Sequence, residues 1–228
     1  MALLSKKENN DGEDSITDFH FPTSKKAIII FTRNPELGKC KTRLAATVGD
    51  EKALEIYKFL IAHTVEITTY LKADKFVYYS EKVHHNDFWD SETFRKKVQE
   101  GDDLGVRMHN AFSEVFSLGY EKAIIIGSDM YDMVTQDIEN AFEGLSDKDF
   151  VIGPAEDGGY YLLGMKEVKS AVFKNKIWGT DTVLKDTLAD LKDEKVLSLT
   201  EKNDVDYYED IKDVEAFQPF LKDLKTDK

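Results

Sequence analysis

Short apolar runs alternate along this chain with segments in which apolar residues recur at helical spacing. Five runs predict β-strands, several of them buried on both faces: Ala27 to Phe31, Phe76 to Tyr79, Ala123 to Ile126, Phe150 to Ile152 and Tyr160 to Leu163. Two segments show the three- and four-residue spacing of a helix face: Ala53, Ile56, Tyr57 and Leu60, and then Met108, Ala111, Phe112, Val115 and Phe116. This alternation predicts an α/β fold with a mostly parallel central sheet and helices on both faces.

Composition and charge fit a single globular domain that handles small ligands. The chain has 228 residues, of which 41% are hydrophobic and 33% charged, enough for one core of ordinary size. Its net charge of -13 gives no overall attraction for nucleic acid or anionic membranes. We expect a flexible polar tail at 1–24, one domain at 25–222 and a polar end at 223–228.

The chain carries no sign of secretion or of a zinc site. Cys40 is the single cysteine, so no intramolecular disulfide forms, and no cluster of residues has the spacing of zinc ligands. The first residues lack the apolar core of a signal peptide, and no apolar run is long enough to cross a bilayer. These features favour the reducing cytoplasm. They leave the oligomeric state open.

A basic loop follows the first predicted strand. Arg33, Lys41 and Arg43 gather there in a protein that is acidic overall, which indicates a bound anion. The loop resembles a phosphate-binding P-loop but lacks its glycines, because Cys40 precedes Lys41-Thr42, and no G-x-G-x-x-G follows the strand. Recognition by side-chain cations remains, with a solvated basic surface as the alternative.

In open parallel sheets, ligands bind beyond the carboxyl ends of the strands, so the loops there carry further candidates. The segment Gly127-Ser128-Asp129 directly follows a predicted strand. Its position places the Asp129 carboxylate where it can hold a divalent metal that bridges phosphate oxygens. The alternative is an ordinary strand-to-helix turn in which Asp129 or Asp132 accepts hydrogen bonds from backbone amides.

A glycine-rich segment at 153–161 separates two predicted strands. Gly158 and Gly159 permit close approach of a ligand, Asp157 can accept hydrogen bonds from hydroxyl groups, and Tyr160 offers a stacking face. The same letters are typical of a β-hairpin with Asp-Gly turn chemistry. Both interpretations hold together if the tip of the hairpin lines a site.

Two further segments carry weaker signals. Arg107 lies at the start of the second predicted helix, within reach of a ligand, although the Asp and Gly residues around it favour a simple turn and cap. Trp178 and Thr180 precede another predicted helix. Thr180 is either an N-cap or a substrate contact, and Trp178 is either a core residue or a platform for a sugar ring.

Taken in order, these segments resemble the bacterial family of nucleotide-diphospho-sugar transferases, also described as arsenosugar-biosynthesis-type glycosyltransferases or radical SAM/selenodomain-associated transferases. The resemblance runs from about Lys26 to Asp213 and rests on these motifs: FTRNPELGKCKTRLA, GDDLGVRM, GSDMYDM, GPAEDGGYYLLG, WGTDTV and DVDYYEDI. It implies a GT-A-type, Rossmann-like nucleotide-binding sandwich, shared with the molybdenum cofactor and phospholactate nucleotidyltransferases.

The resemblance also implies roles for individual residues. The diphosphate of a nucleotide sugar meets the basic loop, and the expected nucleotide-binding residues are Arg33, Lys41, Arg43 and Arg107. Asp129 and Asp206 match metal-binding positions, with Mg²⁺ or Mn²⁺ as the ion, although a helix cap before Tyr207 is the alternative for Asp206. The expected substrate-binding residues are Gly158, Gly159, Tyr160, Trp178 and Thr180.

The expected activity is metal-assisted glycosyl transfer from a nucleotide-diphospho-sugar to a small-molecule acceptor, with Asp129 acting through the metal and Asp157 as base. Two alternatives stay open: a nucleotidyltransferase that acts on a nucleoside triphosphate and a phosphorylated acceptor, and a nucleotide- or sugar-binding module without turnover. Tyr131 and Tyr207-Tyr208 stand where the family usually has proline and Thr-Pro. These changes alter the turns and leave both carboxylates in place.

Overall fold

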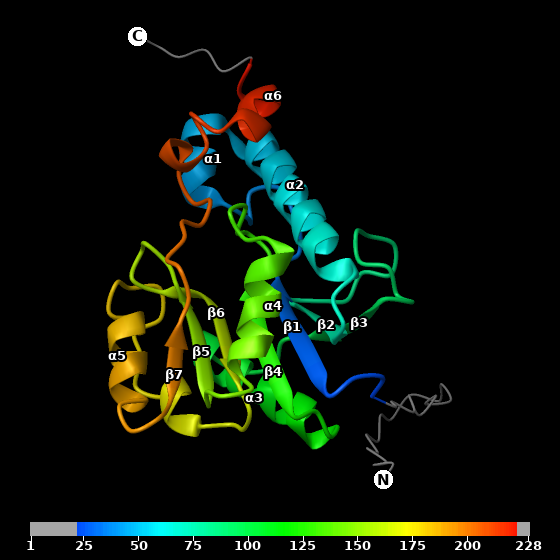
Figure 1. Cartoon of the computed structure of the whole chain (residues 1–228). Coiled ribbons are helices and arrows are strands. Elements are labelled where there is room, and N and C mark those ends of the chain that lie inside the picture. Colours follow the sequence, from blue (N-terminus) through cyan, green and yellow to red (C-terminus); the bar gives the residue numbers. More distant parts are fainter. Residues whose placement is uncertain (1–21, 223–228) are drawn as a thin grey trace.

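A single seven-stranded sheet organises the protein, which we describe over residues 22–222 of a computed structural model (Figure 1). The strands are β1 Lys26–Thr32, β2 Asp74–Tyr79, β3 Phe94–Val98, β4 Lys122–Gly127, β5 Phe150–Pro154, β6 Tyr160–Met165 and β7 Val196–Ser198. Their order across the sheet is β3-β2-β1-β4-β6-β5-β7. Only β6 runs antiparallel to its neighbours in this sheet, so the expected mostly parallel arrangement is confirmed.

Helices pack on both faces of the sheet, as expected. They are α1 Thr42–Val48, α2 Asp50–Thr69, α3 Leu104–Ser117, α4 Thr135–Gly144, α5 Val183–Asp190 and α6 Gln218–Leu221, with 3₁₀ turns at Ser170–Phe173, Tyr208–Asp210 and Glu215–Phe217. Helices α2 and α4 cover one face, and α3 covers the other together with the first 3₁₀ turn and the end of α5. Within residues 22–222, none of these helices is long and apolar enough to cross a membrane.

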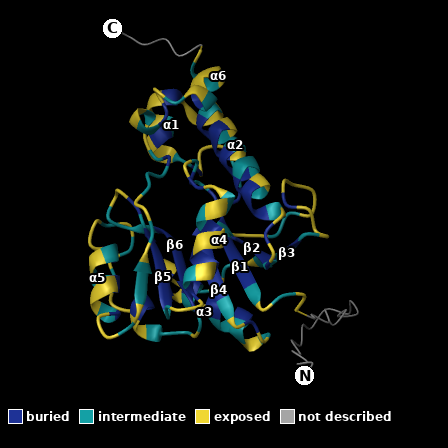
Figure 2. Cartoon of the chain, in the orientation of Figure 1, coloured by how far each residue is buried: buried dark blue, intermediate teal, exposed yellow. Residues whose placement is uncertain are grey.

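The central strand shows why the apolar runs are continuous. Residues 27–30 of β1 are fully buried, because β1 lies between β2 and β4 and has helices on both sides (Figure 2). Ile28 and Ile30 face α2 and α4, whereas Ala27 and Ile29 face α3. A strand buried in this way needs apolar residues at every position rather than at alternate ones.

The sequence analysis did not predict two of the strands, β3 and β7. Strand β3 consists of FRKKV and lies at one edge of the sheet, where charged residues are common because one side of the strand is unpaired. Strand β7 has only three residues at the other edge. The five predicted strands and both predicted amphipathic helices are present.

The expected terminal segments lie almost wholly outside the described residues. Residues 22–24 are the exception within the expected tail. There the Thr23 backbone amide donates a hydrogen bond to the Asp74 carboxylate at 2.8 Å, which ties this part of the chain to the start of β2. Residues 1–21 and 223–228 carry no structural description.

A smaller cluster of apolar residues lies at one end of the molecule, at the top of Figure 1. We call it the C-terminal core, and its buried members are Leu44, Val48, Ala53, Ile56, Leu60, Val205, Ile211 and Phe217. It joins α1 and the first half of α2 to the last part of the chain. It therefore brings the segment around Val205 back to the carboxyl edge of the sheet.

Candidate active site

Two loops begin side by side at the carboxyl edge of the sheet. Strands β1 and β4 pair in parallel, with Phe31 opposite Gly127, so the basic loop after β1 starts next to the turn that carries Asp129. Three buried hydroxyl side chains, those of Thr32, Tyr57 and Ser128, hold these strand ends. The Tyr57 hydroxyl accepts a hydrogen bond from the Arg33 amide at 2.8 Å and lies 3.0 Å from Ser128 Oγ, which donates to Thr32 Oγ1 at 3.0 Å.

Lys41 joins the basic loop to the acidic groups. It has a left-handed backbone conformation, with φ 49° and ψ 46°, immediately before α1, and only 5% of its side chain is exposed. Its ammonium donates to Asp129 Oδ2 and to Asp206 Oδ1, each at 2.8 Å. A residue that was expected to meet a diphosphate thus holds two carboxylates in this structure.

The segment with Asp204 and Asp206 owes its orientation to the residue between them. Val205 is 3% exposed and packs into the C-terminal core, and its amide donates to the Asp129 carbonyl at 3.4 Å. Because successive side chains of an extended segment point to opposite sides, Asp204 and Asp206 both face the site. The expected alternative of an Asp206 cap does not apply, since Asp210 accepts hydrogen bonds from the amides of residues 206 and 207.

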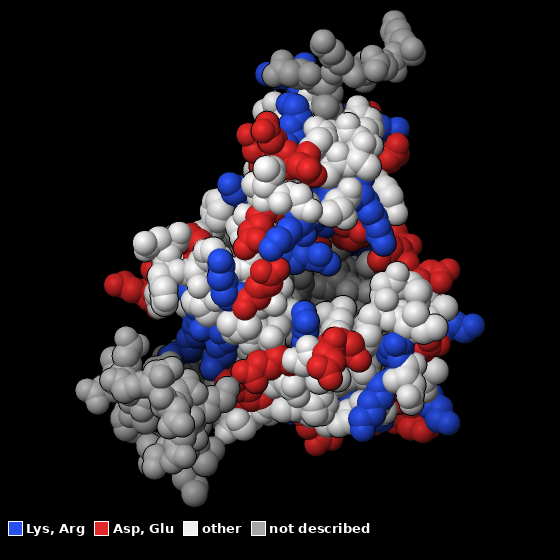
Figure 3. All heavy atoms as spheres, turned by 180° about the vertical axis from the view of Figure 1, so that it is seen from behind, with Lys and Arg blue, Asp and Glu red and all other residues white. Residues whose placement is uncertain are grey.

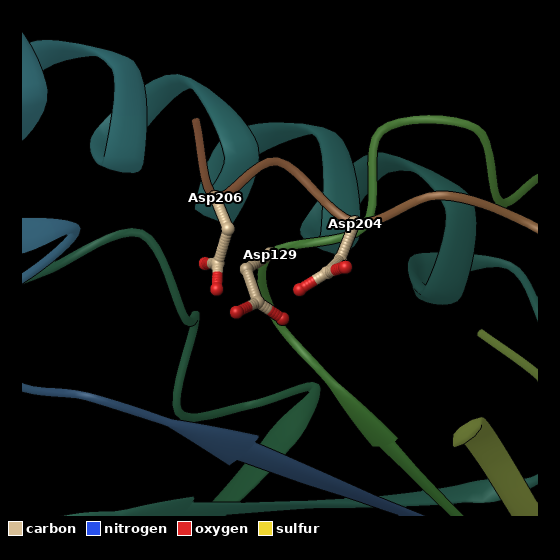
Figure 4. Close-up of side chains that lie close together, drawn as sticks. All are labelled: Asp129, Asp204 and Asp206. Atoms are coloured by element: carbon tan, nitrogen blue, oxygen red, sulfur yellow. The ribbon is translucent and has the colours of Figure 1, made fainter. Parts of the chain in front are cut away.

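Asp129, Asp204 and Asp206 form a group with the chemistry of a divalent-metal site. One oxygen from each lies within 4.8 Å of the others, and the Asp129 carboxylate stands between its two partners (Figure 4). Carboxylate oxygens are the ligands that Mg²⁺ and Mn²⁺ prefer, so the residues fit such an ion. An ion that bound Asp129 Oδ2 and Asp206 Oδ1 would compete with the Lys41 ammonium, which donates hydrogen bonds to these two oxygens.

The electrostatics of this group are unequal. Burial, then repulsion from Asp206 and Asp129, raises the pKa of the Asp204 carboxyl to about 6. Burial also acts to raise the pKa of Asp129, but Lys41 outweighs it and holds that pKa below its ordinary value. Burial opposes the charge of Lys41, and the two carboxylates outweigh it and raise the pKa of its ammonium. Within residues 22–222, Asp204 lacks an ion-pair partner of its own and is the carboxylate that a metal would help most.

A cavity of about 260 Å³ adjoins Asp129 and extends between α3, the β5–β6 hairpin and the segment before α5. We call it the aromatic cavity. The residues expected in the site that line it are Asp129, Asp157, Gly159, Tyr160, Trp178 and Thr180, joined by Asp204. The structure thus gathers most of the expected substrate-binding residues around one space.

The β5–β6 hairpin supports both interpretations of its sequence. Asp157 Oδ1 accepts a hydrogen bond from the Gly159 amide at 2.8 Å, which closes the turn, and the exposed Asp157 still lines the aromatic cavity. Gly158 lies behind the tip with φ +85°, and a side chain there would strike the backbone of Asp181. Its carbonyl accepts from the Leu184 amide at 2.9 Å, so the hairpin is fixed against the start of α5.

Trp178 forms a wall of the aromatic cavity. Its ring packs over Gly105 of α3, where an added Cβ would lie 2.6 Å from Trp178 Cζ2. Tyr160 lies on the same side, with its hydroxyl 3.9 Å from Met108 Sδ. The Thr180 hydroxyl donates to the Ile177 carbonyl at 2.7 Å and lines the cavity, while the N-cap position of α5 belongs to another residue.

The expected nucleotide-binding residues do not form one cluster. Arg43 donates to Asp206 Oδ2 at 2.9 Å and lies over the Tyr207 ring at 5.7 Å. The exposed Arg33 acts on Asp129 through its charge. Arg107 instead donates from Nε to the Gly101 carbonyl at 2.9 Å and stays outside the lining of the aromatic cavity. Figure 3 shows lysine and arginine side chains at the margin of a hollow on the face opposite to that of Figure 1.

Sequence reasoning missed one member of the acidic group, and it noted one unusual residue that the structure now places. Asp204 was overlooked, although an Asp-x-Asp pattern around an apolar residue places both carboxylates on one side of an extended segment. Tyr131, which stands at a usual proline position, packs into the C-terminal core with its ring 4.9 Å from that of Phe217. The ring of Tyr131 thus serves the apolar packing next to the turn that carries Asp129.

Comparison with known families gives one match. The family model described as an uncharacterised protein conserved in bacteria (DUF2064) matches residues 64–180. This span includes α3, β4 and the β5–β6 hairpin, and it ends at Thr180. No curated protein matches the chain significantly.

Several solved structures share the fold. A candidate nucleotide-diphospho-sugar transferase from Desulfovibrio desulfuricans G20 is 30% identical, covers 87% of this chain and 94% of its own, and has a TM-score of 0.78. A cytidylyltransferase from Leptospira borgpetersenii serovar Hardjo-bovis (strain JB197) is 10% identical over 80% of this chain and 78% of its own, with TM-score 0.52. CMP:2-keto-3-deoxy-manno-octonic acid synthetase in complex with CTP is 12% identical, covers 86% of this chain and 99% of its own, and has a TM-score of 0.54. At these identities, the last two share the fold alone.

Proposed function

This chain belongs to the bacterial family DUF2064, and on that premise we propose that it is a metal-dependent transferase that moves a sugar from a nucleotide-diphospho-sugar to a small-molecule acceptor. The similarity to the Desulfovibrio protein, whose name refers to such a transferase, supports the substrate class. The resident ion is Mg²⁺ or Mn²⁺. The proposed place of action is the cytoplasm.

One observation carries the proposal. A group of three carboxylates, Asp129, Asp204 and Asp206, lies between the basic residues of the loop after β1 and the aromatic cavity. Metal-assisted glycosyl transfer from a nucleotide sugar uses three such elements: cations for the diphosphate, a site for a divalent ion, and a pocket for the acceptor. The arrangement explains why the acidic group contains an internal lysine.

The leaving group meets the basic side of the site. When the bond between the anomeric carbon and the phosphate oxygen breaks, its electron pair and the negative charge stay with the nucleoside diphosphate. We assign Arg33, Lys41 and Arg43 to that charge, where cations lower the barrier most; Lys41 and Arg43 already meet beside the acidic group, where both pair with Asp206. The ion held by the three aspartates would supply further positive charge to the same oxygens.

The acceptor meets the other side. Its hydroxyl oxygen forms the new bond to the anomeric carbon and gives up its proton. Asp157 is our candidate base, because its carboxylate is held by the Gly159 amide at the edge of the aromatic cavity and is exposed to a ligand there. Asp157→Asn would keep the turn, since an amide oxygen accepts the same hydrogen bond, and would remove the base.

A binding experiment tests the proposal directly. Thermal shifts are measured with UDP-, GDP-, ADP- and dTDP-sugars and with the matching triphosphates, with and without Mn²⁺. We expect a metal-dependent shift with one diphosphate sugar that disappears in Asp129→Asn. The matched control is Asp132→Asn, which removes an exposed carboxylate three positions along and should respond as the unmodified protein does.

Product analysis separates the proposed activity from its alternatives. Release of a nucleoside diphosphate from the sugar donor supports glycosyl transfer. Release of pyrophosphate from a triphosphate would instead make the protein a nucleotidyltransferase. If the protein binds nucleotides or sugars but releases neither a nucleoside diphosphate nor pyrophosphate with any donor and acceptor tested, it is a binding module without turnover.

A further inference from the structure

The polar side of the aromatic cavity carries charge of one sign. Asp129, Asp157 and Asp204 line it, and among residues 22–222 no lysine or arginine does. Lys41 lies just beyond Asp129, but both of its contacts go to carboxylates. A phosphate that entered this space would find acidic oxygens and no cation of the chain to pair with.

A bound divalent ion would not reverse this balance. Asp129, Asp204 and Asp206 carry three formal negative charges, and Asp157 at the cavity edge adds a fourth. Lys41, Arg43, which pairs with Asp206, and one divalent cation would together cancel these four charges without exceeding them. Asp157 stays outside that group and keeps its own charge at the edge of the cavity. These carboxylates would repel a negatively charged ligand at close range, and the repulsion is stronger in a partly buried space than in open water.

The rest of the cavity is apolar and shaped in advance. Trp178 packs against Gly105, and the hairpin with Tyr160 is fixed to the start of α5 through Gly158. The volume of about 260 Å³ lies below the range of roughly 300–1,000 Å³ that is typical for drug-sized ligands. Such a space suits one ring stacked on an aromatic wall rather than an extended molecule.

We propose that the aromatic cavity binds the acceptor, and that this acceptor is an uncharged or cationic ring compound with a free hydroxyl group, without phosphate or carboxylate. The inference rests on the proposed function, because it assigns the two sides of one site to two substrates. The inference goes beyond the proposed function because it excludes phosphorylated acceptors. The donor keeps its phosphates on the side of Arg33, Lys41 and Arg43.

Quenching of tryptophan fluorescence tests the charge of the cavity without a known ligand. The chain has two tryptophans, and Trp89 is 2% exposed, so subtracting the signal of a Trp178→Phe variant isolates Trp178. We expect acrylamide, which is neutral, and caesium to quench Trp178 more strongly than iodide does. Asp157→Asn should raise quenching by iodide, whereas Asp132→Asn, which removes the same charge elsewhere, should leave it unchanged. Stronger quenching by iodide than by caesium would overturn the proposal.

Matched ligands then test the acceptor class. D-glucose and glucose 6-phosphate, D-ribose and ribose 5-phosphate, and adenosine and AMP are compared for their ability to protect Trp178 from acrylamide in the presence of Mg²⁺. In at least one pair, we expect the compound without phosphate to protect Trp178 at a concentration at least tenfold lower than its phosphorylated partner does. In Asp157→Asn, the ratio of these two concentrations should be smaller. Equal or better protection by the phosphorylated members, or no protection by any member, would contradict the inference.

The two proposals fail in different ways. If no nucleotide-diphospho-sugar binds but the charge preference of Trp178 holds, the transferase is wrong and the ligand class of the cavity stands. If a nucleotide sugar binds with metal but iodide and the phosphorylated probes are preferred, the transferase stands and this ligand class is wrong.

Discussion

The two sides of the site differ in what holds their residues in place. On the basic side, Lys41, Asp129 and Asp206 are fixed by short ion pairs. On the cavity side, Trp178 and Tyr160 are fixed by packing against α3. Ion pairs hold the residues of the basic side, so a bound ion can rearrange them. Packing holds the residues of the aromatic cavity, so the cavity keeps its shape. The proposed transferase would gain from this division, because its leaving group would change charge during the reaction and the acceptor ring would not.

Lys41 is the strongest test of the electrostatic side. We expect Lys41→Met to weaken binding of the nucleotide-diphospho-sugar by roughly 10- to 100-fold, since a hydrogen bond to a charged group contributes about 1.5–3 kcal/mol. The same variant should bind Mn²⁺ more tightly, because the ammonium no longer occupies Asp129 and Asp206. Calorimetry with the nucleotide sugar and electron paramagnetic resonance titration with Mn²⁺ measure the two effects.

Lys39 provides the matched control for this variant. It lies in the same loop, 57% of its side chain is exposed, and it pairs with Glu36 instead of the acidic group. An exposed pair of this kind contributes little, so Lys39→Met should bind both ligands within about twofold of the unmodified protein. Weaker Mn²⁺ binding by Lys41→Met would show that Lys41 supports the ion rather than competing with it.

Trp178 tests the steric side, with a smaller expected effect. Trp178→Leu removes the aromatic wall and leaves the aspartates untouched, so acceptor binding should weaken by about tenfold, or about 1.4 kcal/mol. The affinity for the nucleotide sugar should stay within about twofold. The measurement is the KM for acceptor against the Kd for donor. An equal loss in both would mean that the two sides are not separate binding regions.

Asp204 tests the acidic group through protein stability rather than through ligand binding. Its pKa of about 6 in the folded protein lies above the ordinary value of 3.8, so the folded state holds the proton more tightly than the unfolded chain. Ionisation of Asp204 therefore lowers the stability of the metal-free protein as the pH rises from about 4 to 6, and the loss persists above that range. Asp204→Asn should raise Tm by a few degrees at pH 8 and change it little at pH 4.

Calorimetry in EDTA measures this difference, with Asp132→Asn as the exposed control. Added Mg²⁺ should reverse the ranking at pH 8, because the unmodified protein gains binding energy that the variant lacks. A variant that is less stable than the unmodified protein at every pH would show that Asp204 makes a stabilising contact when ionised.

The sequence predicted the fold better than it predicted the contacts within the site. Strand β1 was predictable because burial on both faces requires a continuous apolar run, while FRKKV in β3 was not, because an edge strand tolerates charge. The glycine-rich hairpin and Asp129 were found from turn chemistry and strand ends. These features depend on residues that are near one another in the chain.

The pairing of Lys41 with Asp206 could not be predicted from local pattern. The two residues are 165 positions apart, and their contact depends on the packing of Val205 and its neighbours in the C-terminal core. The sequence pattern predicted that Lys41 meets the diphosphate of a ligand, which stays a prediction, and it gave no sign of the contacts with Asp129 and Asp206. Asp204 was accessible in principle through its spacing from Asp206.

The position of the C-terminal core has a consequence for biosynthesis. All seven strands of the sheet end by Ser198, whereas Asp204 and Asp206 follow them in the chain, and Phe217 of that core comes later still. A ribosome delivers residues in this order, at about 5–20 per second, so every strand emerges before the second and third carboxylates do. An ion that needs all three carboxylates would therefore find its ligands only after Asp206 has emerged, and a chain cut short after β7 would have all seven strands but no complete acidic group.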